Sequence, residues 1–528
     1  MVLSPQKLWE SYDRSLMPLD VSEIYRGKTA FGEERRVYFN GEPSALGCTR
    51  IYARLLTPAK PTDKLVIVFP EPTQDVHGVN FDFLLEKNWA VLVTDYAGNA
   101  FDRARFTIYP SALSFADYNE QTIYAPADAP QKTCWYIWTT VCLRSVTFAQ
   151  NQGFSRVALF GMGAGGSGVL KTAALSDFPV CALSLFSPGF FPTTDNPELL
   201  GLSVSINVSG YIPMLKIPFL QLCCSNDADS SLDAISDYME QSNKNGILHI
   251  APRVDRSITQ EIFADVDIFL SSYLTDERPP APEELAPETT FTLSGSQKQL
   301  YLSLQYEKNV QDVRFYVSHG IANAAYRNWR EVPAEKAGEN EYIGCTEVFF
   351  ADRPVYAFCY ITTDTGFSYC TPVEQRLPSA LHITPATIVK RRLIYESDMG
   401  LDDFFTTDER HPPEMKAGPF DIEGICGRRG LCTYKLGDVA FSGAPDSALS
   451  VLIFSSVPQQ ITFSVTDQDQ FNTYTCTKTV SPDADWTKLI LSASDLKSAD
   501  GAFAGWHRAI FLRIDAQEEF IISSLLWV

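Results

Sequence analysis

Apolar residues in the first 275 positions form short uninterrupted runs that alternate with helix-like segments. Uninterrupted apolar runs are typical of parallel strands that are buried on both faces. We predict such strands at 64–69, 89–94, 156–160, 180–186, 218–224 and 246–250. Helical periodicity is found at 135–149, 168–175 and 257–274, where Ile258, Ile262, Phe263 and Val266 share one stripe. Strands that alternate with helices predict an α/β fold with a mostly parallel sheet.

The pattern changes after residues 276–290 (DERPPAPEELAPETT), which have no apolar face and are predicted to form a linker. Residues 291–384 contain short alternating strands such as LYLSLQY and VRFYVS, which predict an immunoglobulin-like β-sandwich. Residues 385–528 are also rich in strands and favour a larger sandwich of the jelly-roll type. We therefore predict an α/β domain over 1–275, followed by two all-β sandwich domains.

Charge and cysteine usage limit the classes of partner and compartment. The 528 residues include 43 Lys and Arg against 64 Asp and Glu, a net charge of −21, so we expect binding neither to nucleic acid nor to anionic membranes. No apolar run reaches the roughly 18 residues of a membrane span, and the start lacks the pattern of a signal peptide. We expect a cytoplasmic protein, or an extracellular one if a leader has been removed. The 12 cysteines are scattered, and we expect reduced thiols, including Cys426 and Cys432, which could otherwise pair or bind a metal.

The most specific local motif is a glycine-rich turn, GMGAGGSG, at 161–168, between a predicted strand and a predicted helix. Phosphate-binding loops use this geometry, and so do the nucleophile elbows of hydrolases. The string fits G-x-G-x-x-G twice, but the next strand ends in Ser187-Pro188 without an acidic residue for a ribose. As an elbow of the form G-x-S-x-G, the turn places Gly163 at the nucleophile position.

Several segments of residues 1–275 resemble the α/β-hydrolases, in particular the acetyl xylan esterase and prolyl-oligopeptidase-like branch. They are LWESYDRSLMPLD, TRIYARLLTP, WAVLVTDYAGNA and TCWYIWTTVCLRSVTFAQNQ, in the order that this branch shows. The resemblance implies an α/β-hydrolase fold and a site for a serine, a histidine and a carboxylate. It implies no cofactor and no metal.

The catalytic residues that this resemblance implies are largely absent. Gly163 has no side chain, and Arg256 stands in the string PRVDR where the branch has its histidine. Arginine stays protonated, so it cannot act as a general base. Only Asp227 fits the position of the acid, and Pro70 and Pro72 lack the N–H groups expected of an oxyanion hole. We predict a degenerate triad.

Other residues near these positions are candidates for a binding pocket. Glu71, Ala164 and His77 are candidate pocket residues, while Ser167 and His249 are the residues that could replace missing catalytic groups. Asp227 and Arg256 are expected to face each other as a structural ion pair. Alternatively, Arg256 would recognise an acidic ligand such as a uronic acid.

The last domain resembles the carbohydrate-binding modules of bacterial glycan enzymes, through segments such as GICGRRGLCTYKLGD. Sugar binding uses exposed aromatic platforms, for which Tyr474, Trp486 and Trp506 are candidates. The sequence thus favours a catalytically degenerate esterase relative that binds a carbohydrate or an acidic small molecule, or acts as a scaffold, and that could form oligomers. An ester hydrolase with non-standard residues and a dinucleotide-dependent enzyme remain the alternatives.

Overall fold

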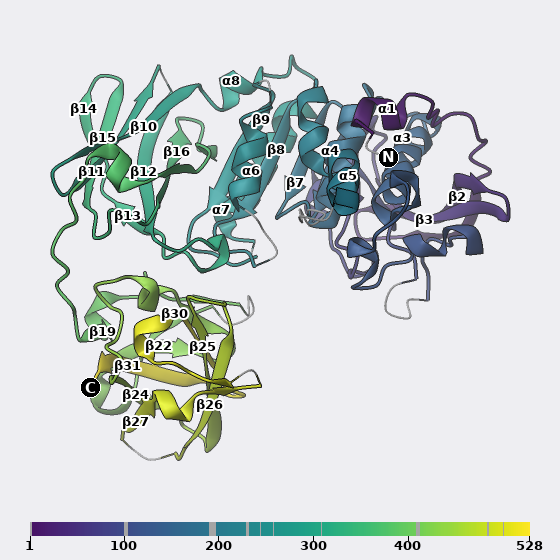
Figure 1. Cartoon of the computed structure of the whole chain (residues 1–528). Coiled ribbons are helices and arrows are strands. Elements are labelled where there is room, and N and C mark those ends of the chain that lie inside the picture. The colour runs from purple at the N-terminus through teal and green to yellow at the C-terminus, as the bar shows by residue number, and fades with distance from the viewer. Residues whose placement is uncertain are drawn as a thin grey trace.

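A nine-stranded sheet forms the centre of the N-terminal half of the chain (Figure 1). The computed structural model describes residues 3–528 except 100–103, 190–196, 229–231, 243, 257, 308, 408–411, 483–484 and 500, and it does not describe the side chains of 197–200. The strands are β1 (Ser22–Lys28), β2 (Gly32–Ser44), β3 (Gly47–Pro58), β4 (Lys64–Phe69), β5 (Ala90–Thr94), β6 (Arg156–Met162), β7 (Cys181–Leu185), β8 (Phe219–Cys224) and β9 (Gly246–Ala251).

The order of these strands identifies the fold. The sheet runs β1-β2-β3-β5-β4-β6-β7-β8-β9, with β1 to β3 antiparallel and the strands from β5 to β9 parallel. Strand β3 is antiparallel to its neighbour β5, and β5 precedes β4 in the sheet although it follows β4 in the chain. This is the arrangement of the α/β-hydrolase fold. The N-terminal half therefore has the fold that the sequence predicts.

Alternating side chains of the central strands bury both faces of the sheet. In β4, Leu65 and Ile67 pack with helices α3 (Cys134–Asn151) and α4 (Ala164–Leu175), whereas Val66 and Val68 pack on the side of α7 (Gln260–Tyr273). The other helices are α1 (Pro5–Trp9), α2 (Asp82–Glu86), α5 (Pro197–Ile206), α6 (Leu232–Met239) and α8 (Pro282–Leu285). Burial on both faces explains why these strands are apolar without interruption.

Two helices differ from the sequence prediction. Helix α4 begins at Ala164 instead of residue 168, because its first turn consists of glycines that give no apolar periodicity. The predicted stripe of α7 was wrong at Ile258 and Phe263, which are 43% and 45% exposed. Ile258 precedes the helix, and Phe263 packs at the surface against Phe83.

The rest of the chain forms two all-β sandwich domains, each with two antiparallel sheets. In the middle domain one sheet contains β10 (Thr289–Ser296), β11 (Gln299–Tyr306), β15 (Glu341–Glu347) and β14 (Glu335–Gly338). The other contains β13 (Arg330–Val332), β12 (Val310–His319), β16 (Val355–Thr363), β17 (Ser368–Cys370) and β18 (Glu374–Arg376). The predicted linker contains the short helix α8, and Pro287 in it accepts a hydrogen bond of 2.8 Å from the Tyr369 hydroxyl.

The C-terminal sheets are larger, and their facing side chains form one separate core. One contains β21 (Glu414–Ala417), β22 (Glu423–Gly427), β31 (Phe520–Trp527), β24 (Ala448–Phe454), β27 (Thr487–Ser492) and β19 (Leu393–Glu396). The other contains β20 (Phe405–Thr406), β23 (Leu431–Thr433), β30 (Ala509–Asp515), β25 (Gln459–Asp467), β26 (Thr473–Val480), β28 (Lys497–Ser498) and β29 (Gly501–Ala502).

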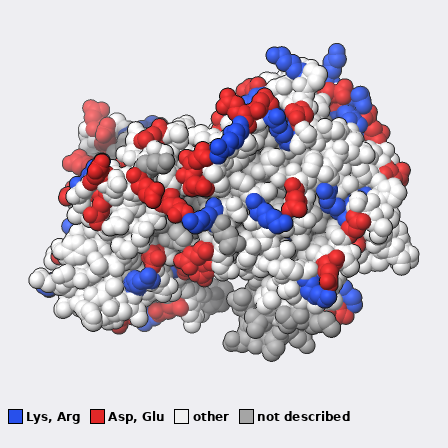
Figure 2. Space-filling model, turned by 90° about the horizontal axis from the view of Figure 1, so that it is seen from above, with Lys and Arg blue, Asp and Glu red and all other residues white. Residues whose placement is uncertain are grey.

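The surface combines both signs of charge. Figure 2 shows acidic and basic side chains interspersed over the face seen from above. Among the helices that the structure describes, none has the length and apolarity needed to cross a membrane.

The middle domain lies against the β9 edge of the hydrolase-fold sheet (Figure 1). Buried polar groups join the two. Within this interface, His249 Nδ1 on β9 lies 2.9 Å from Asp265 Oδ2 on α7. The other oxygen of Asp265 accepts a 2.9 Å hydrogen bond from the backbone N–H of Ser368 on β17. Both side chains are almost completely buried, so His249 has a structural role between two domains.

A second buried contact joins the same two domains. Arg327 of the middle domain is fully buried, and its guanidinium donates two hydrogen bonds of 2.6 Å to the Asp233 carboxylate on α6. It also lies 3.4 Å from the centre of the Tyr356 ring. Paired hydrogen bonds to one carboxylate fix the relative orientation of the two groups.

We predict that Arg327→Ala lowers the free energy of unfolding by about 3 kcal/mol, because it removes a fully buried side chain together with its hydrogen bonds to Asp233 and to two backbone carbonyls. The loss is measured as a shift of the urea unfolding midpoint. Arg376→Ala is the matched control, because Arg376 pairs with Glu374 at the surface of the same domain, and we expect a change below about 0.5 kcal/mol. Equal shifts for both variants would contradict a structural role of the buried pair.

Candidate functional site

The glycine-rich turn has the geometry of a nucleophile elbow. Strand β6 ends at Met162, helix α4 begins at Ala164, and Gly163 between them has φ +53° and ψ −123°. A Cβ atom at Gly161 would overlap with the backbone of Gly165, and one at Gly165 would overlap with the carbonyl of Phe69. The glycines therefore allow the strand, the turn and the helix to approach each other closely.

The space beside Gly163 is filled by a side chain from another element. A Cβ atom built at Gly163 would overlap with the carboxylate of Glu71, which follows strand β4. Gly163 is also the N-cap of α4, and a carboxylate at a helix N-terminus is favoured by the helix dipole. Glu71 thus stands where a nucleophilic side chain would stand, and where a nucleotide phosphate would bind in the dinucleotide hypothesis.

Arg256 links Glu71 to the predicted acid position. Its guanidinium forms an ion pair with the Glu71 carboxylate, and its Nη1 lies 3.8 Å from Oδ1 of the buried Asp227. It also lies 5.4 Å from the centre of the Phe186 ring. We call Glu71, Arg256 and Asp227 the ion triad. Asp227 and Arg256 face each other, as the sequence led us to expect, but Glu71 is a second acidic partner that the expectation lacked.

The backbone around Glu71 offers little to an oxyanion. Pro70 and Pro72 have no N–H, and the N–H of Glu71 donates a 3.3 Å hydrogen bond to Oε1 of Gln74. In a hydrolase the loop after this strand supplies one of the two donors that stabilise the tetrahedral intermediate. In this chain that loop presents a carboxylate instead.

The ion triad borders a cleft of about 880 Å³. Glu71, Ala164 and Arg256 line it together, as do residues from the irregular segment that precedes α3. The described lining residues are Glu71, Pro72, Thr73, Gln74, Tyr118, Glu120, Ile123, Tyr124, Trp135, Ala164, Ser187, Gly189, Ala228 and Arg256.

His77 does not join this group. It lines a separate pocket of about 220 Å³, where its Nε2 lies 2.8 Å from the hydroxyl of Tyr52. Burial and the nearby Arg54 and Arg36 lower the pKa of His77. His77 and Glu71 are therefore close in the sequence but line different pockets.

No protein-family model and no curated protein sequence matches this chain. Solved structures do align with its N-terminal half, including an acetyl xylan esterase from Paenibacillus sp. R4, with 14% identity and a TM-score of 0.39 over 49% of this chain and 90% of that chain. Acetyl xylan esterase 1 from Thermoanaerobacterium sp. aligns at 13% identity and a TM-score of 0.38, over 49% and 88% of the two chains. An esterase from Pyrococcus furiosus aligns at 16% identity and a TM-score of 0.34, over 49% and 98%. At these identities the likeness concerns the fold alone.

The aromatic candidates in the C-terminal domain do not form exposed platforms. Trp506 is fully buried, and its indole N–H donates a 3.1 Å hydrogen bond to the carbonyl of Leu491. Tyr474 is also buried, with its hydroxyl 3.1 Å from Oδ2 of Asp467. Trp486 is half-buried and donates to the carbonyl of Pro419. Tyr474 on β26 and Trp506 in a short 3-10 helix belong to the core of the sandwich, whereas Trp486 lies just before β27 at its margin.

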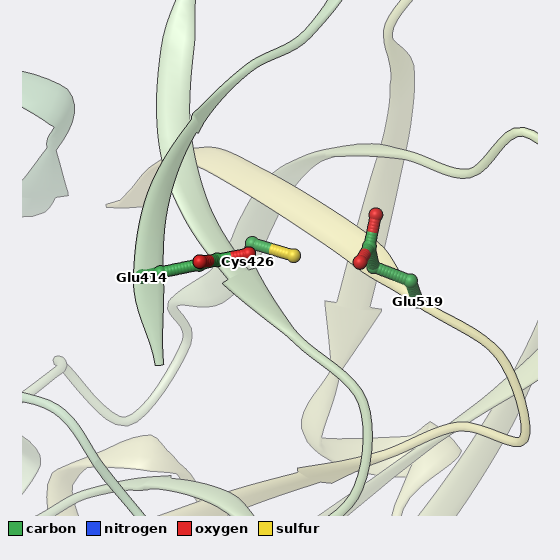
Figure 3. Close-up of side chains that lie close together, drawn as sticks. All are labelled: Glu414, Cys426 and Glu519. Carbon is green, nitrogen blue, oxygen red and sulfur yellow. The ribbon is translucent and has the colours of Figure 1, made fainter. Parts of the chain in front are cut away.

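Cys426 lies in a small cluster with two acidic residues (Figure 3). Its sulfur is directed toward Glu519, and the ligand-type atoms of Glu414, Cys426 and Glu519 lie within 4.8 Å of one another. Burial and the adjacent Glu519 raise the pKa of Cys426 to about 12, so the thiol keeps its proton at neutral pH. Lys416 forms an ion pair with Glu519. All cysteines, Cys432 included, are free thiols.

The overlap at the elbow gives a first test of the site. We predict that Gly163→Ala lowers the free energy of unfolding by about 1–3 kcal/mol through backbone strain alone, and by more because of the clash with Glu71. In a Glu71→Ala background the same substitution should cost less, because only the strain remains. Thermal and urea unfolding measure both differences.

Gly400→Ala is the matched control. Gly400 has a similar backbone conformation, φ +68° and ψ −148°, but no atom lies within 4 Å of a Cβ built there. Its substitution should reproduce the strain without the clash. An equal loss at positions 163 and 400, unaffected by Glu71→Ala, would contradict the proximity of Glu71 to the elbow.

Proposed function

We propose that this protein is a non-hydrolytic relative of the esterases with an α/β-hydrolase fold, and that its cleft binds an uncharged hydroxylated ligand such as an oligosaccharide. The observation that supports this most directly is the position of Glu71. Its carboxylate occupies the space that a nucleophile at position 163 would need.

Acyl transfer in this fold needs a nucleophile, a base that accepts its proton, and donors for the oxyanion. Gly163 provides no nucleophile, Arg256 cannot accept a proton, and Glu71 adds negative charge where negative charge would develop. Neither replacement residue fits this chemistry. Ser167 is buried within α4, and His249 is paired with Asp265 at the domain interface. These contacts speak against the alternative of an ester hydrolase with non-standard residues.

The lining of the cleft favours an uncharged ligand. Among its described residues, two carboxylates, those of Glu71 and Glu120, stand against the single guanidinium of Arg256, which already pairs with acidic groups. An acidic ligand would therefore meet a net negative wall, contrary to the uronic-acid hypothesis at Arg256. Tyr124 is 52% exposed and lines the cleft, as do the polar residues Thr73 and Gln74. Aromatic faces with adjacent polar groups suit the alternating apolar and hydroxyl surfaces of sugars.

The absence of hydrolysis can be tested with the purified full-length chain. Turnover of an activated aryl acetate should not exceed that of a heat-denatured blank, and a serine-directed fluorophosphonate probe should leave the protein unlabelled. Glu71→Ala should not restore either activity, because removing the carboxylate supplies neither nucleophile nor base. Saturable turnover that survives repurification would refute the proposal.

Ligand binding is tested separately by calorimetric titration with neutral xylo-oligosaccharides. We predict saturable binding that Tyr124→Ala weakens at least about tenfold, since stacked aromatic contacts contribute on the order of 1 kcal/mol or more each. Tyr301→Ala is the control, because Tyr301 is an exposed tyrosine of the middle domain outside the cleft. Addition of NAD or FAD should leave the melting temperature unchanged, whereas clear stabilisation would favour the dinucleotide alternative.

A further inference from the structure

A second cavity, of about 280 Å³, lies between the middle and the C-terminal domain. The middle domain contributes the end of β12 and the loops near Arg330 and Arg353, and the C-terminal domain contributes residues 436–442, Gln468 and the start of β30. The two domains are in contact around it. Arg330 Nη1 lies 3.3 Å from Asp438 Oδ2, and the Tyr326 ring stacks on Phe471 at 5.5 Å between centres.

Three residues that line this cavity have buried polar atoms without a partner. Ser318 Oγ, His319 Nε2 and His507 Nδ1 are each shielded from solvent, and none forms a hydrogen bond with any part of the chain that the structure describes. Ser318 is only 1% exposed. Buried polar groups without hydrogen bonds are costly, so three around one cavity indicate a polar occupant. They come from both domains, which shows that domain docking assembles the cavity.

The cavity also has an excess of positive charge, in a chain whose net charge is −21. Of its two arginines, Arg330 faces Asp438, while Arg353 has no carboxylate within ion-pair distance among the described residues. Arg353 lies over the Phe350 ring, with its guanidinium carbon 4.3 Å from the ring centre. Burial and the positive charge of Arg330 lower the pKa of His319 to about 3. His319 is therefore neutral at pH 7 and can offer one donor or one acceptor.

The remaining walls suit a compact ligand with both apolar and hydroxyl-bearing sides. Phe349, Ile321 and Ile510 provide apolar surface, whereas Asn328 and Gln468 provide amides. The guanidiniums of Arg330 and Arg353 and the carboxylate of Asp438 give the lining one net positive charge, which a bound ligand would balance. A monoanion balances this charge, and a dianionic phosphate would exceed it.

We propose that this interdomain cavity binds a hydroxylated monocarboxylate of the size of one sugar ring, a sugar acid. Arg353 holds the carboxylate, and Ser318, His319 and His507 form hydrogen bonds with the hydroxyl groups. The site is separate from the cleft of the hydrolase fold, so its existence does not depend on the function proposed for that cleft. Because its walls belong to two domains, an occupant also strengthens their docking.

Calorimetric titration of the full-length chain with D-glucuronate tests this proposal. We expect one site per chain, at least tenfold weaker binding of D-glucose, and at least tenfold weaker binding of glucuronate by Arg353→Gln. Arg429→Gln is the matched control, because Arg429 is an exposed arginine of the C-terminal domain outside the cavity, and its affinity should equal that of the wild type. Arg353 is itself exposed, so Arg353→Gln should fold normally, which its melting temperature verifies.

Several outcomes would overturn the proposal. They are the absence of glucuronate binding at millimolar concentration, equal binding of glucose and glucuronate, and an unchanged affinity in Arg353→Gln. Tighter binding of inorganic phosphate than of glucuronate would refute the choice of a monocarboxylate. Binding that Tyr124→Ala abolishes and Arg353→Gln does not would assign the ligand to the other cleft.

Discussion

The carboxylate of Glu71 lies against a residue that has no side chain, and the rest of the candidate site depends on this contact. With glycine at position 163 the Glu71 carboxylate fills the space where a Cβ would stand, and Arg256 pairs with that carboxylate. Arg256 also lies 3.8 Å from the buried Asp227, so its positive charge offsets charge on that carboxylate as well. The glycine at position 163, the carboxylate of Glu71 and the guanidinium of Arg256 therefore fit one another. Together they form a self-consistent electrostatic unit at the wall of the cleft.

The turn keeps the geometry of an elbow with a glycine at its centre. Gly161 and Gly165 still allow close packing among β6, α4 and β4, and Gly163 keeps the positive φ of the turn. These features serve the packing of the sheet and helix whether or not a nucleophile is present. The backbone shape of the elbow therefore places no requirement on the side chain at position 163.

Domain docking shapes the second region of interest. The buried His249–Asp265 pair and the hydrogen bonds of the buried Arg327 to Asp233 fix the middle domain against the hydrolase-fold unit. The C-terminal domain meets the middle domain through stacked rings and the Arg330–Asp438 pair, and a polar cavity remains between them. Directional contacts of this kind hold the domains in defined orientations, so that side chains from both can line one pocket.

The sequence by itself determined the alternation of buried strands and helices and the tight glycine turn around Gly163, because these are local patterns of polarity and spacing. The contact between Asp227 and Arg256 was predicted from the resemblance to the hydrolases, in which the acid and the histidine meet at these positions. Only the tertiary structure decided that Glu71 fills the elbow, that His77 lies elsewhere, and that Trp506 is buried. The tertiary structure also placed Tyr124 in the cleft, and it placed Ser318 and His507, which belong to different domains, around one cavity. Such contacts join residues that are far apart in the chain, and no short-range pattern encodes which irregular loops and which domain surfaces will meet.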